Sequence, residues 1–390
     1  MISLNSDCTG CGACKFACPK DAIEINYSRG NFLEPVVDLD LCVDCGFCEK
    51  VCPNNITTNN KNIKSVFAGV NNDVEALKKS TSGGAFYSIA ESVLSMGGVV
   101  YGCAYTEHLR AKHVRVDNIE NLVRLQGSKY VQSEIGNTYL DVKKDLESKR
   151  IVLFSGTPCQ IAGLYGFLDG DYDDLITIDI ICHGVSSQLF FDKYIKWYEK
   201  KHNIVVNNYD FRSKENKGWS LSGIVIGDKK GKEIKRKIYY FSEFYYFYFL
   251  KGTIYRSSCY TCKYTNTHRL GDITLGDCWG IESLNTNLSI KNGCSLIILN
   301  SDKGINLLKK TDIELIEIPF EKVISYNRQL VEPSIKPQNR KSIIDRFSDL
   351  DGKDIDRAFK KEEKKSIMIG RIKYLFPSSA RKLLSRIRNK

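Results

Sequence analysis

Two cysteine-rich stretches decide the fold of the N-terminal region: residues 8–19 read CTGCGACKFACP, and residues 42–53 read CVDCGFCEKVCP. Both follow the pattern C-x2-C-x2-C-x3-C-P, and the second is offset from the first by 34 residues. Three thiolates at intervals of three residues can surround one iron–sulfur cube from a tight loop, where Gly12 and Gly46 let the backbone approach the sulfurs. The fourth cysteine of each stretch points away and binds the other cube.

This exchange of the fourth ligand predicts two 4Fe–4S clusters. The ligands of the first are Cys8, Cys11, Cys14 and Cys52, and those of the second are Cys42, Cys45, Cys48 and Cys18. A pair of zinc sites is the alternative, but a zinc site closes with four ligands and does not need the doubled pattern of eight cysteines. The motif resembles the bacterial-type dicluster ferredoxin family, with all eight ligands matched, which implies a module that moves single electrons at low potential.

Length and composition indicate a larger folded protein around this motif. The chain has 390 residues and 15 cysteines, with 42% apolar and 26% charged residues, as in globular proteins of two or three domains. It has neither an apolar stretch of the roughly 18–20 residues that a membrane-spanning helix needs nor a secretory signal in its first residues, MISLNSDCTG. We therefore expect a cytoplasmic location, where clustered cysteines indicate metal or redox chemistry because disulfides are rare.

Charge is distributed unevenly along the chain. The formal net charge is +11, but residues 1–55 carry −4 and the remainder therefore +15. An acidic small module and a basic large one favour mutual docking and an anionic ligand for the large one. Residues 361–390 alone carry +8, and residues 377–387 could form a basic amphipathic helix that touches anionic lipid or an acidic partner, although a solvated or locally packed tail fits equally. No RNA-binding fingerprint accompanies the charge, so we expect no nucleic-acid partner.

From about residue 65 the pattern changes to alternating helices and strands, after a polar, Asn-rich stretch at 54–64 that we interpret as a linker. Residues 80–86 read STSGGAF and precede an amphipathic helix. The exposed backbone N–H groups of such a start can seat a phosphate, or simply begin a capped helix. Residues 126–131 read QGSKYV, which is either a second anion-binding turn or an ordinary loop.

Four cysteines of the body are candidates for one site. Two of them follow consecutive predicted strands, 151–154 and 175–181, and the other two form a C-x2-C pair further on. The carboxyl ends of parallel strands meet at one sheet edge, where α/β proteins place their sites. A third 4Fe–4S cluster, a structural zinc site and, for some of them, plain buried thiols remain open. The four residues are Cys159, Cys182, Cys259 and Cys262.

The other chemically notable residues of the body favour structural roles. Cys103 lies inside an apolar strand and Cys294 precedes one, so we interpret both as core thiols, whereas Cys278 is ambiguous. His183 is the only histidine inside a site-like motif, and a structural histidine is the simpler interpretation. The aromatic stretch 239–250 predicts a helix packed into the core rather than the wall of a ring-stacking pocket.

Six motifs follow in order between residues 80 and 280: STSGGAF, GSKYVQS, LFSGTPCQIAGL, ICHGVSS, SCYTCKY and GDITLGDCWG. Together they resemble the coenzyme F420 hydrogenase/dehydrogenase beta-subunit family over about residues 65–310. The resemblance implies an α+β fold, with a small ferredoxin-type N-terminal domain followed by a larger mixed α/β flavin-binding domain that holds one further 4Fe–4S cluster. It also implies FAD, which can exchange electrons singly or in pairs and so links clusters to a hydride carrier.

Carried over by position, the resemblance assigns site residues. The flavin-binding residues would be Ser82, Gly83, Gly84, Ser128, Lys129, Tyr130, Gly156 and Thr157. The third-cluster ligands would be Cys159, Cys182, Cys259 and Cys262. We name no catalytic side chain, because hydride transfer to a bound flavin does not require one. The family pattern leads us to expect an aromatic residue where Cys278 stands, which makes Cys278 either an extra thiol or a substitute ligand.

The expected domains are a dicluster domain at 1–60, the two parts of the catalytic region at 65–145 and 146–330, and a basic tail at 331–390.

The favoured function is an iron–sulfur flavoprotein oxidoreductase that transfers electrons between 4Fe–4S clusters and a soluble hydride carrier, F420-like or NAD(P)H, through FAD. The alternative is a non-enzymatic electron-transfer subunit that feeds a partner reductase, for example in surface polysaccharide synthesis. Exposed clusters are usually oxygen-sensitive, so we expect an anaerobic host.

Overall fold

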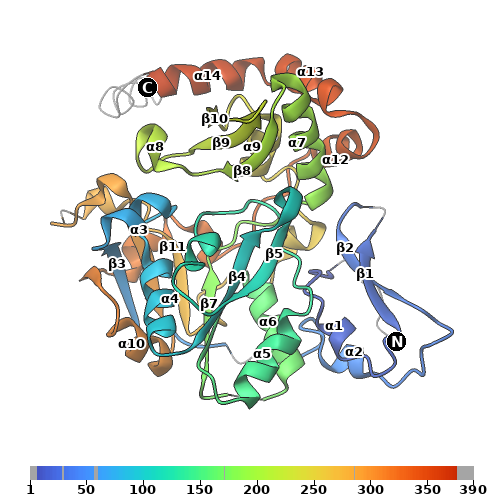
Figure 1. Ribbon diagram of the computed structural model, residues 1–390, viewed down its shortest axis with the longest axis vertical. Coiled ribbons are helices and arrows are strands. Elements are labelled where there is room, and N and C mark those ends of the chain that lie inside the picture. Colours follow the sequence, from blue (N-terminus) through green and yellow to red (C-terminus); the bar gives the residue numbers. More distant parts are fainter. Residues whose placement is uncertain (1–6, 29, 57–59, 171, 285, 376–390) are drawn as a thin grey trace.

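The structure is a computed structural model that describes residues 7–375 except 29, 57–59, 171 and 285 (Figure 1). It consists of a small N-terminal module, a large sheet with its covering helices, and a smaller sheet that packs with the C-terminal helices. In this part of the chain no helix is long and apolar enough to cross a membrane. The basic helix expected at residues 377–387 lies outside the described residues.

The N-terminal module, which spans residues 7–56, is built around one hairpin and two short helices. The antiparallel hairpin pairs β1 (Ile23–Tyr27) with β2 (Leu33–Val37), and the helices are α1 (Ala13–Phe16) and α2 (Phe47–Lys50). Each helix starts directly after a glycine with positive φ, +80° at Gly12 and +74° at Gly46. A side chain would strain both turns. The two stretches of the cysteine repeat therefore fold alike.

The large sheet is mixed. Its strands are β3 (Ser65–Asn71), β4 (Val99–Tyr105), β5 (Ala111–Val116), β6 (Val152–Gly156), β7 (Leu175–Ile180), β11 (Ile273–Asp277), β12 (Ser295–Leu299) and β13 (Ile313–Glu317). They lie in the order β13-β3-β12-β11-β7-β6-β4-β5. The central strands β4, β6, β7 and β11 are parallel to their neighbours in this series, and the outer pairs are antiparallel. The strands predicted at 151–154 and 175–181 are confirmed.

Helices cover both faces of the large sheet. They are α3 (Val74–Lys79), α4 (Ala85–Ser95), α5 (Thr138–Glu147), α6 (Pro158–Leu168), α10 (Asp302–Leu308) and α11 (Phe320–Ile324). Val100 and Leu153 pack in the core that contains α4, whereas Val99 and Phe154 pack in the core that contains α5 and α6. Because successive strand residues point to opposite faces, a strand covered on both sides needs a continuous apolar run. The expected mixed α/β body is confirmed.

A smaller sheet lies at the top of the view in Figure 1. It contains β8 (Val205–Asp210), β9 (Ser222–Lys229) and β10 (Lys232–Tyr239), paired antiparallel in the order β10-β9-β8. The helices of this layer are α7 (Gln188–His202), α8 (Lys214–Lys217), α9 (Phe244–Leu250), α12 (Arg340–Asp349), α13 (Gly352–Glu362) and α14 (Lys364–Leu375). Residues 244–249 are all buried, so the aromatic stretch forms core helix α9, as predicted.

The described part of the expected C-terminal tail is folded rather than free. Residues 340–375 form helices α12, α13 and α14. Phe347 and Phe359 are buried in the same aromatic core as α9, at 1% and 0% exposure. Apolar side chains recur at helical spacing here, such as Ile343 and Phe347, so the described part of the expected tail is locally packed, which is the alternative to a solvated tail.

Candidate iron–sulfur centre

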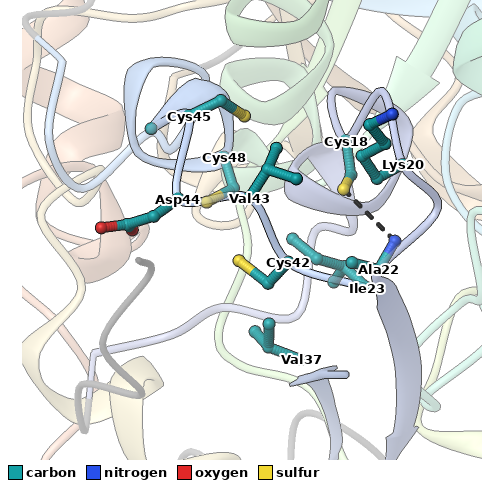
Figure 2. A pocket seen from close by; sticks show the side chains of 11 residues that line it. Cys18, Lys20, Ala22, Ile23, Val37, Cys42, Val43, Asp44, Cys45 and Cys48 are labelled. Atoms are coloured by element: carbon teal, nitrogen blue, oxygen red, sulfur yellow. Dashed lines mark hydrogen bonds between the residues drawn. The ribbon is translucent and has the colours of Figure 1, made fainter. Parts of the chain in front are cut away.

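One set of repeat cysteines lines a small cavity of the N-terminal module (Figure 2). We call it the second cysteine group: Cys18, Cys42, Cys45 and Cys48. Ile23, Val37 and Val43 complete the apolar wall, and the backbone N–H of Ala22 donates a 3.3 Å hydrogen bond to the Sγ of Cys18. Cys18 belongs to the first stretch of sequence and the other three to the second, so the structure brings together the set that the spacing assigned.

The remaining repeat cysteines form the first cysteine group: Cys8, Cys11, Cys14 and Cys52. Cys11 and Cys14 are buried. Burial, together with the nearby Cys159, Cys8 and Cys52, raises the pKa of Cys11 to about 12. Burial and the neighbouring thiols also raise the pKa of Cys14. Thiolates at this depth need a cation beside them, which is what cluster iron supplies.

The four cysteines of the body also come together, and we call them the third cysteine group. Cys159 lies in the first turn of α6, just after β6, and Cys182 follows β7, the parallel neighbour of β6. The C-x2-C pair comes from a short 3-10 helix, Ser257–Thr261, and the residue after it. Burial, with Cys159 adding to it, raises the pKa of Cys259 to about 12 and of Cys262 to about 11. Burial and the other three thiols raise the pKa of Cys182.

The donor chemistry of these groups suits iron–sulfur clusters. Each group offers four cysteine sulfurs, and soft thiolate ligands select iron–sulfur clusters or zinc. Within residues 7–375 as described, no three Cys, His, Asp or Glu side chains lie close enough to hold a single metal ion. A cluster bound here would supply single-electron transfer, and these thiols would hold its iron.

The first and third cysteine groups are neighbours because Cys11 packs on helix α6. A Cβ atom added to Gly163 of this helix would lie 2.9 Å from the Cβ of Cys11 and 3.0 Å from its Sγ. One turn further on, a Cβ on Gly166 would lie 2.3 Å from the backbone oxygen of Val51. Both glycines therefore let the module approach the helix that carries Cys159.

Two basic residues beside the C-x2-C pair hold the module from the other side. Arg256, whose side chain is 3% exposed, donates from Nη1 to the Leu33 carbonyl at 2.8 Å, and the Lys263 Nζ donates to the Pro53 carbonyl. We did not single out either residue from the sequence. The module is acidic and the body is basic, and both residues lie next to predicted ligands. This charge contrast could have indicated that they contact the module.

The two loops predicted to bind the flavin lie against each other. The backbone N–H of Ser128 donates to the Thr81 Oγ1 at 2.9 Å, and the Ser82 hydroxyl donates to the Cys294 carbonyl at 2.7 Å. Lys129 turns back on its own loop, with its Nζ donating to the Gln126 carbonyl at 2.6 Å, and burial lowers its pKa. The structure thus brings residues 80–84 and 126–130 into direct contact.

Packing of the chain explains the glycines of the first loop. A Cβ on Gly83 would lie 2.1 Å from the Gly69 oxygen and 2.4 Å from the Ser295 nitrogen, so the loop fits between β3 and β12 only without a side chain. Gly84 has a φ of +81° and precedes a buried Ala85 at the start of α4. The phosphate-binding role of both glycines stays a prediction.

Gly156 and Thr157 lie beside the third cysteine group. Gly156 ends β6, and Thr157 caps α6 through a reciprocal pair of hydrogen bonds with Gln160. The Thr157 Oγ1 lies 3.1 Å from the Sγ of Cys159. The structure therefore places Thr157, one of the two predicted flavin residues, against the thiol of Cys159.

A buried arginine that sequence reasoning missed lies next to Tyr130. The Tyr130 ring stacks on Phe249 with centroids 4.4 Å apart, and its hydroxyl accepts from the Arg212 Nη1 at 3.4 Å. The same guanidinium pairs with Asp277 at 3.0 Å and lies over the Trp279 ring. Among the described residues its buried Nη2 has no hydrogen-bond partner, so it can donate to an acceptor atom of a bound molecule.

The remaining cysteines are separate from these groups in their contacts. The backbone N–H of Cys278 donates to the Cys294 carbonyl at 2.9 Å, and both residues are fully buried. A hydrogen bond with the Cys294 thiol, followed by burial, raises the pKa of Cys278. Cys103 lies in β4 and is half-buried.

Burial lowers the pKa of His183, whose backbone carbonyl accepts a hydrogen bond from the Ser334 hydroxyl.

A ferredoxin-like cysteine module docked on a mixed α/β body with a further four-cysteine group defines an iron–sulfur electron-transfer protein. Residues 7–56 match the family model of the 4Fe-4S dicluster domain. Residues 149–320 match the family model for the C-terminal part of the beta subunit of coenzyme F420 hydrogenase/dehydrogenase. Residues 7–56 are thus similar to a dicluster domain, and residues 149–320 to the C-terminal region of that beta-subunit family. The resemblance read from the ordered motifs is confirmed.

Two further comparisons complete the picture. The chain is similar to a chain in the solved structure of the F420-reducing [NiFe] hydrogenase complex from Methanosarcina barkeri. The two share 16% sequence identity, with a TM-score of 0.45, and the match covers 75% of this chain and 93% of the other. A search of curated proteins finds no match.

Proposed function

We propose that this protein is an oxidoreductase that passes electrons between three 4Fe–4S clusters and FAD, and between FAD and a soluble hydride carrier, F420-like or NAD(P)H. The contact between Cys11 and Gly163 supports this proposal most directly. It brings the first cysteine group of the module next to the third cysteine group of the body, and the hydrogen bonds of Arg256 and Lys263 hold the two parts together. Electrons would pass through the module, then the third group, then the flavin.

An external redox protein would exchange electrons with the second cysteine group. Cys45 is exposed, and the adjacent Val43 and Phe47 expose 59% and 47% of their surface. Asp40 and Asp44 are exposed in the same stretch. An apolar centre with surrounding charge is typical of a protein contact surface, and its negative sign favours a basic partner.

The flavin is proposed at the surface formed by residues 80–84, residues 126–130 and Arg212. A flavin accepts electrons singly and returns them in pairs, which is the chemistry that joins clusters to a hydride carrier. Arg212 supports this proposal, because a buried guanidinium with one nitrogen unpartnered in the described structure is a costly arrangement without a ligand. Ser82, Gly83 and Gly84 would cradle the flavin phosphates, and Ser128, Lys129 and Tyr130 would lie beside the flavin.

The first test is the composition of protein purified without oxygen. Three four-iron clusters predict about 12 iron atoms per chain, with matching acid-labile sulfide and one FAD. About 8 iron atoms together with zinc and no flavin would contradict the proposal and leave a ferredoxin joined to a zinc-stabilised domain.

The second test asks whether electrons from the module reach the flavin through the third cluster. Cys159→Ser should retain about 8 iron atoms in the module but prevent the reduced module from reducing the flavin in rapid-mixing absorbance measurements. The matched control is Cys103→Ser, a half-buried thiol outside the three groups, which should keep all three clusters. Flavin reduction at the wild-type rate in Cys159→Ser would contradict the relay.

A further inference from the structure

The hydroxyl group of Tyr264 is buried and has no hydrogen-bond partner in the described structure. Tyr264 is 6% exposed and lies two residues after Cys262. An unpaired hydroxyl in a protein interior costs about 1–3 kcal/mol. Native structures rarely leave such a group unpaired, and a bound ion or cofactor is one of the usual partners. The orphan hydroxyl therefore points to an acceptor atom that belongs to a bound group.

The surroundings of Tyr264 identify that acceptor. Its side chain packs in one apolar core with Cys11 of the module, and Cys159 and Cys262 of the body pack against the same core. Burial and then the charges of Cys159, Cys11, Cys262 and Cys52 raise its pKa. Sulfur ligands of both the first and the third cysteine groups therefore share one core with this phenol, so a cluster bound there would offer sulfur as the acceptor.

The backbone holds Tyr264 in this place. The Tyr264 carbonyl accepts a 3.0 Å hydrogen bond from the Nη1 of Arg269, which is itself buried and paired with Asp179 at 3.3 Å. Lys263, the preceding residue, donates to the Pro53 carbonyl of the module. The phenol is thus anchored at the junction by its neighbour in sequence and by the body.

We propose that the Tyr264 hydroxyl donates a hydrogen bond to a sulfur at the junction of the first and third clusters, and that it raises the reduction potential of the cluster that accepts it. A donor to a cluster sulfur stabilises the more negative, reduced state. Tyr264 is a positioning residue in this role, since it transfers neither an electron nor a proton. The inference rests on the proposed function, because a cluster must be bound.

Tyr139 provides a matched control in the same core. It is fully buried and also lies near Cys11 and Cys159, whose charges add to burial in raising its pKa. Its hydroxyl, however, donates a 2.9 Å hydrogen bond to the Gln160 carbonyl. Tyr139→Phe therefore removes a buried hydroxyl that already has a protein partner, whereas Tyr264→Phe removes one that does not.

The experiment is a redox titration of the full-length, anaerobically purified protein, followed by electron paramagnetic resonance. In Tyr264→Phe we expect full iron content and a lower midpoint potential for one cluster, with about a tenfold change in its reduction equilibrium, or about 59 mV for one electron. In Tyr139→Phe we expect wild-type potentials and lower stability. Unchanged potentials in Tyr264→Phe, or an equal change in Tyr139→Phe, would overturn the proposal.

Two further outcomes are informative. If Tyr264→Phe loses iron, Tyr264→His, which keeps an N–H donor, must restore the cluster, and loss of iron in both variants would show a packing role instead. If the wild type contains only about 8 iron atoms, the third cluster and the proposed relay are wrong. The Tyr264 inference is then decided on the first cluster alone, whose potential must still fall in Tyr264→Phe.

Discussion

The Nε of Arg256 donates a 2.7 Å hydrogen bond to the backbone carbonyl of Cys8, across 248 positions of sequence. The Ser258 hydroxyl donates to the same carbonyl at 3.1 Å. The residue that begins the cysteine repeat is therefore held by the segment that supplies Cys259 and Cys262. The same short segment therefore holds the module and supplies two of the four cysteines of the third cysteine group.

Replacing this guanidinium should weaken docking. Arg256→Gln removes the charge-assisted bonds to Cys8 and Leu33, and we expect the free energy of unfolding of the module to fall by about 2–3 kcal/mol. Anaerobic urea denaturation, followed by cluster absorbance, measures this loss. The control is Arg328→Gln, which breaks an exposed ion pair with Glu332 and should cost less than about 0.5 kcal/mol. Equal effects would show that Arg256 does not hold the module.

A methyl group on α6 should separate the first cysteine group from the third. Gly163→Ala places a Cβ within 3.0 Å of the Cys11 side chain, and such overpacking typically costs about 1–3 kcal/mol. We expect the first cluster to lose iron to a chelator several-fold faster than in the wild type. Gly170→Ala is the control just after the same helix, where the nearest atoms to a new Cβ are 3.8 Å away. Identical iron-loss rates in both variants would contradict the contact.

Cys278 should not be a cluster ligand. Its closest described partner is Cys294, beside the antiparallel pair β11 and β12, so Cys278→Ser should retain the wild-type iron content. Cys182→Ser, the positive control, should lose about four iron atoms. Iron analysis with electron paramagnetic resonance decides between them. A comparable loss of iron from Cys278→Ser would make this residue a ligand and remove one of the four that we assign.

The buried Glu243 should make stability depend on pH. Burial raises its pKa to about 7, while its carboxylate accepts a 2.8 Å hydrogen bond from Tyr194. The folded state therefore binds more protons than the unfolded state between the ordinary value of 4.5 and about 7, so stability is present at low pH and is lost as pH rises through that range. Between about pH 6 and pH 8 we expect a loss of about 1 kcal/mol from this group.

Glu243→Gln should reduce that loss, because glutamine keeps an acceptor for Tyr194 without a charge. Denaturation at about pH 6 and pH 8 measures the difference, and the exposed Glu321→Gln serves as the control. A Glu243→Gln variant with the same pH dependence as the wild type would show that Glu243 ionises normally in the folded protein.

The dicluster module could be predicted almost completely from the sequence. Its ligands lie close together in each stretch, so local geometry alone limits which thiols can share a cube, and Gly12 and Gly46 mark the turns that the loops require. The parallel strands that end near Cys159 and Cys182 could also be predicted, because their apolar runs show burial on both faces. Because these two strands are parallel neighbours, Cys159 and Cys182 follow strand ends at the same edge of the sheet.

Other features were decided only by the tertiary structure. Gly83 carries a motif typical of phosphate loops, yet its missing side chain is explained by the close approach of Gly69 and Ser295. Gly163 and Tyr264 lie inside two of the ordered motifs and Arg256 lies just before one, yet their contacts with the distant N-terminal module are apparent only in the tertiary structure. Sequence patterns report interactions between near neighbours in the chain, whereas docking of the module depends on shape, burial and paired charge between distant segments.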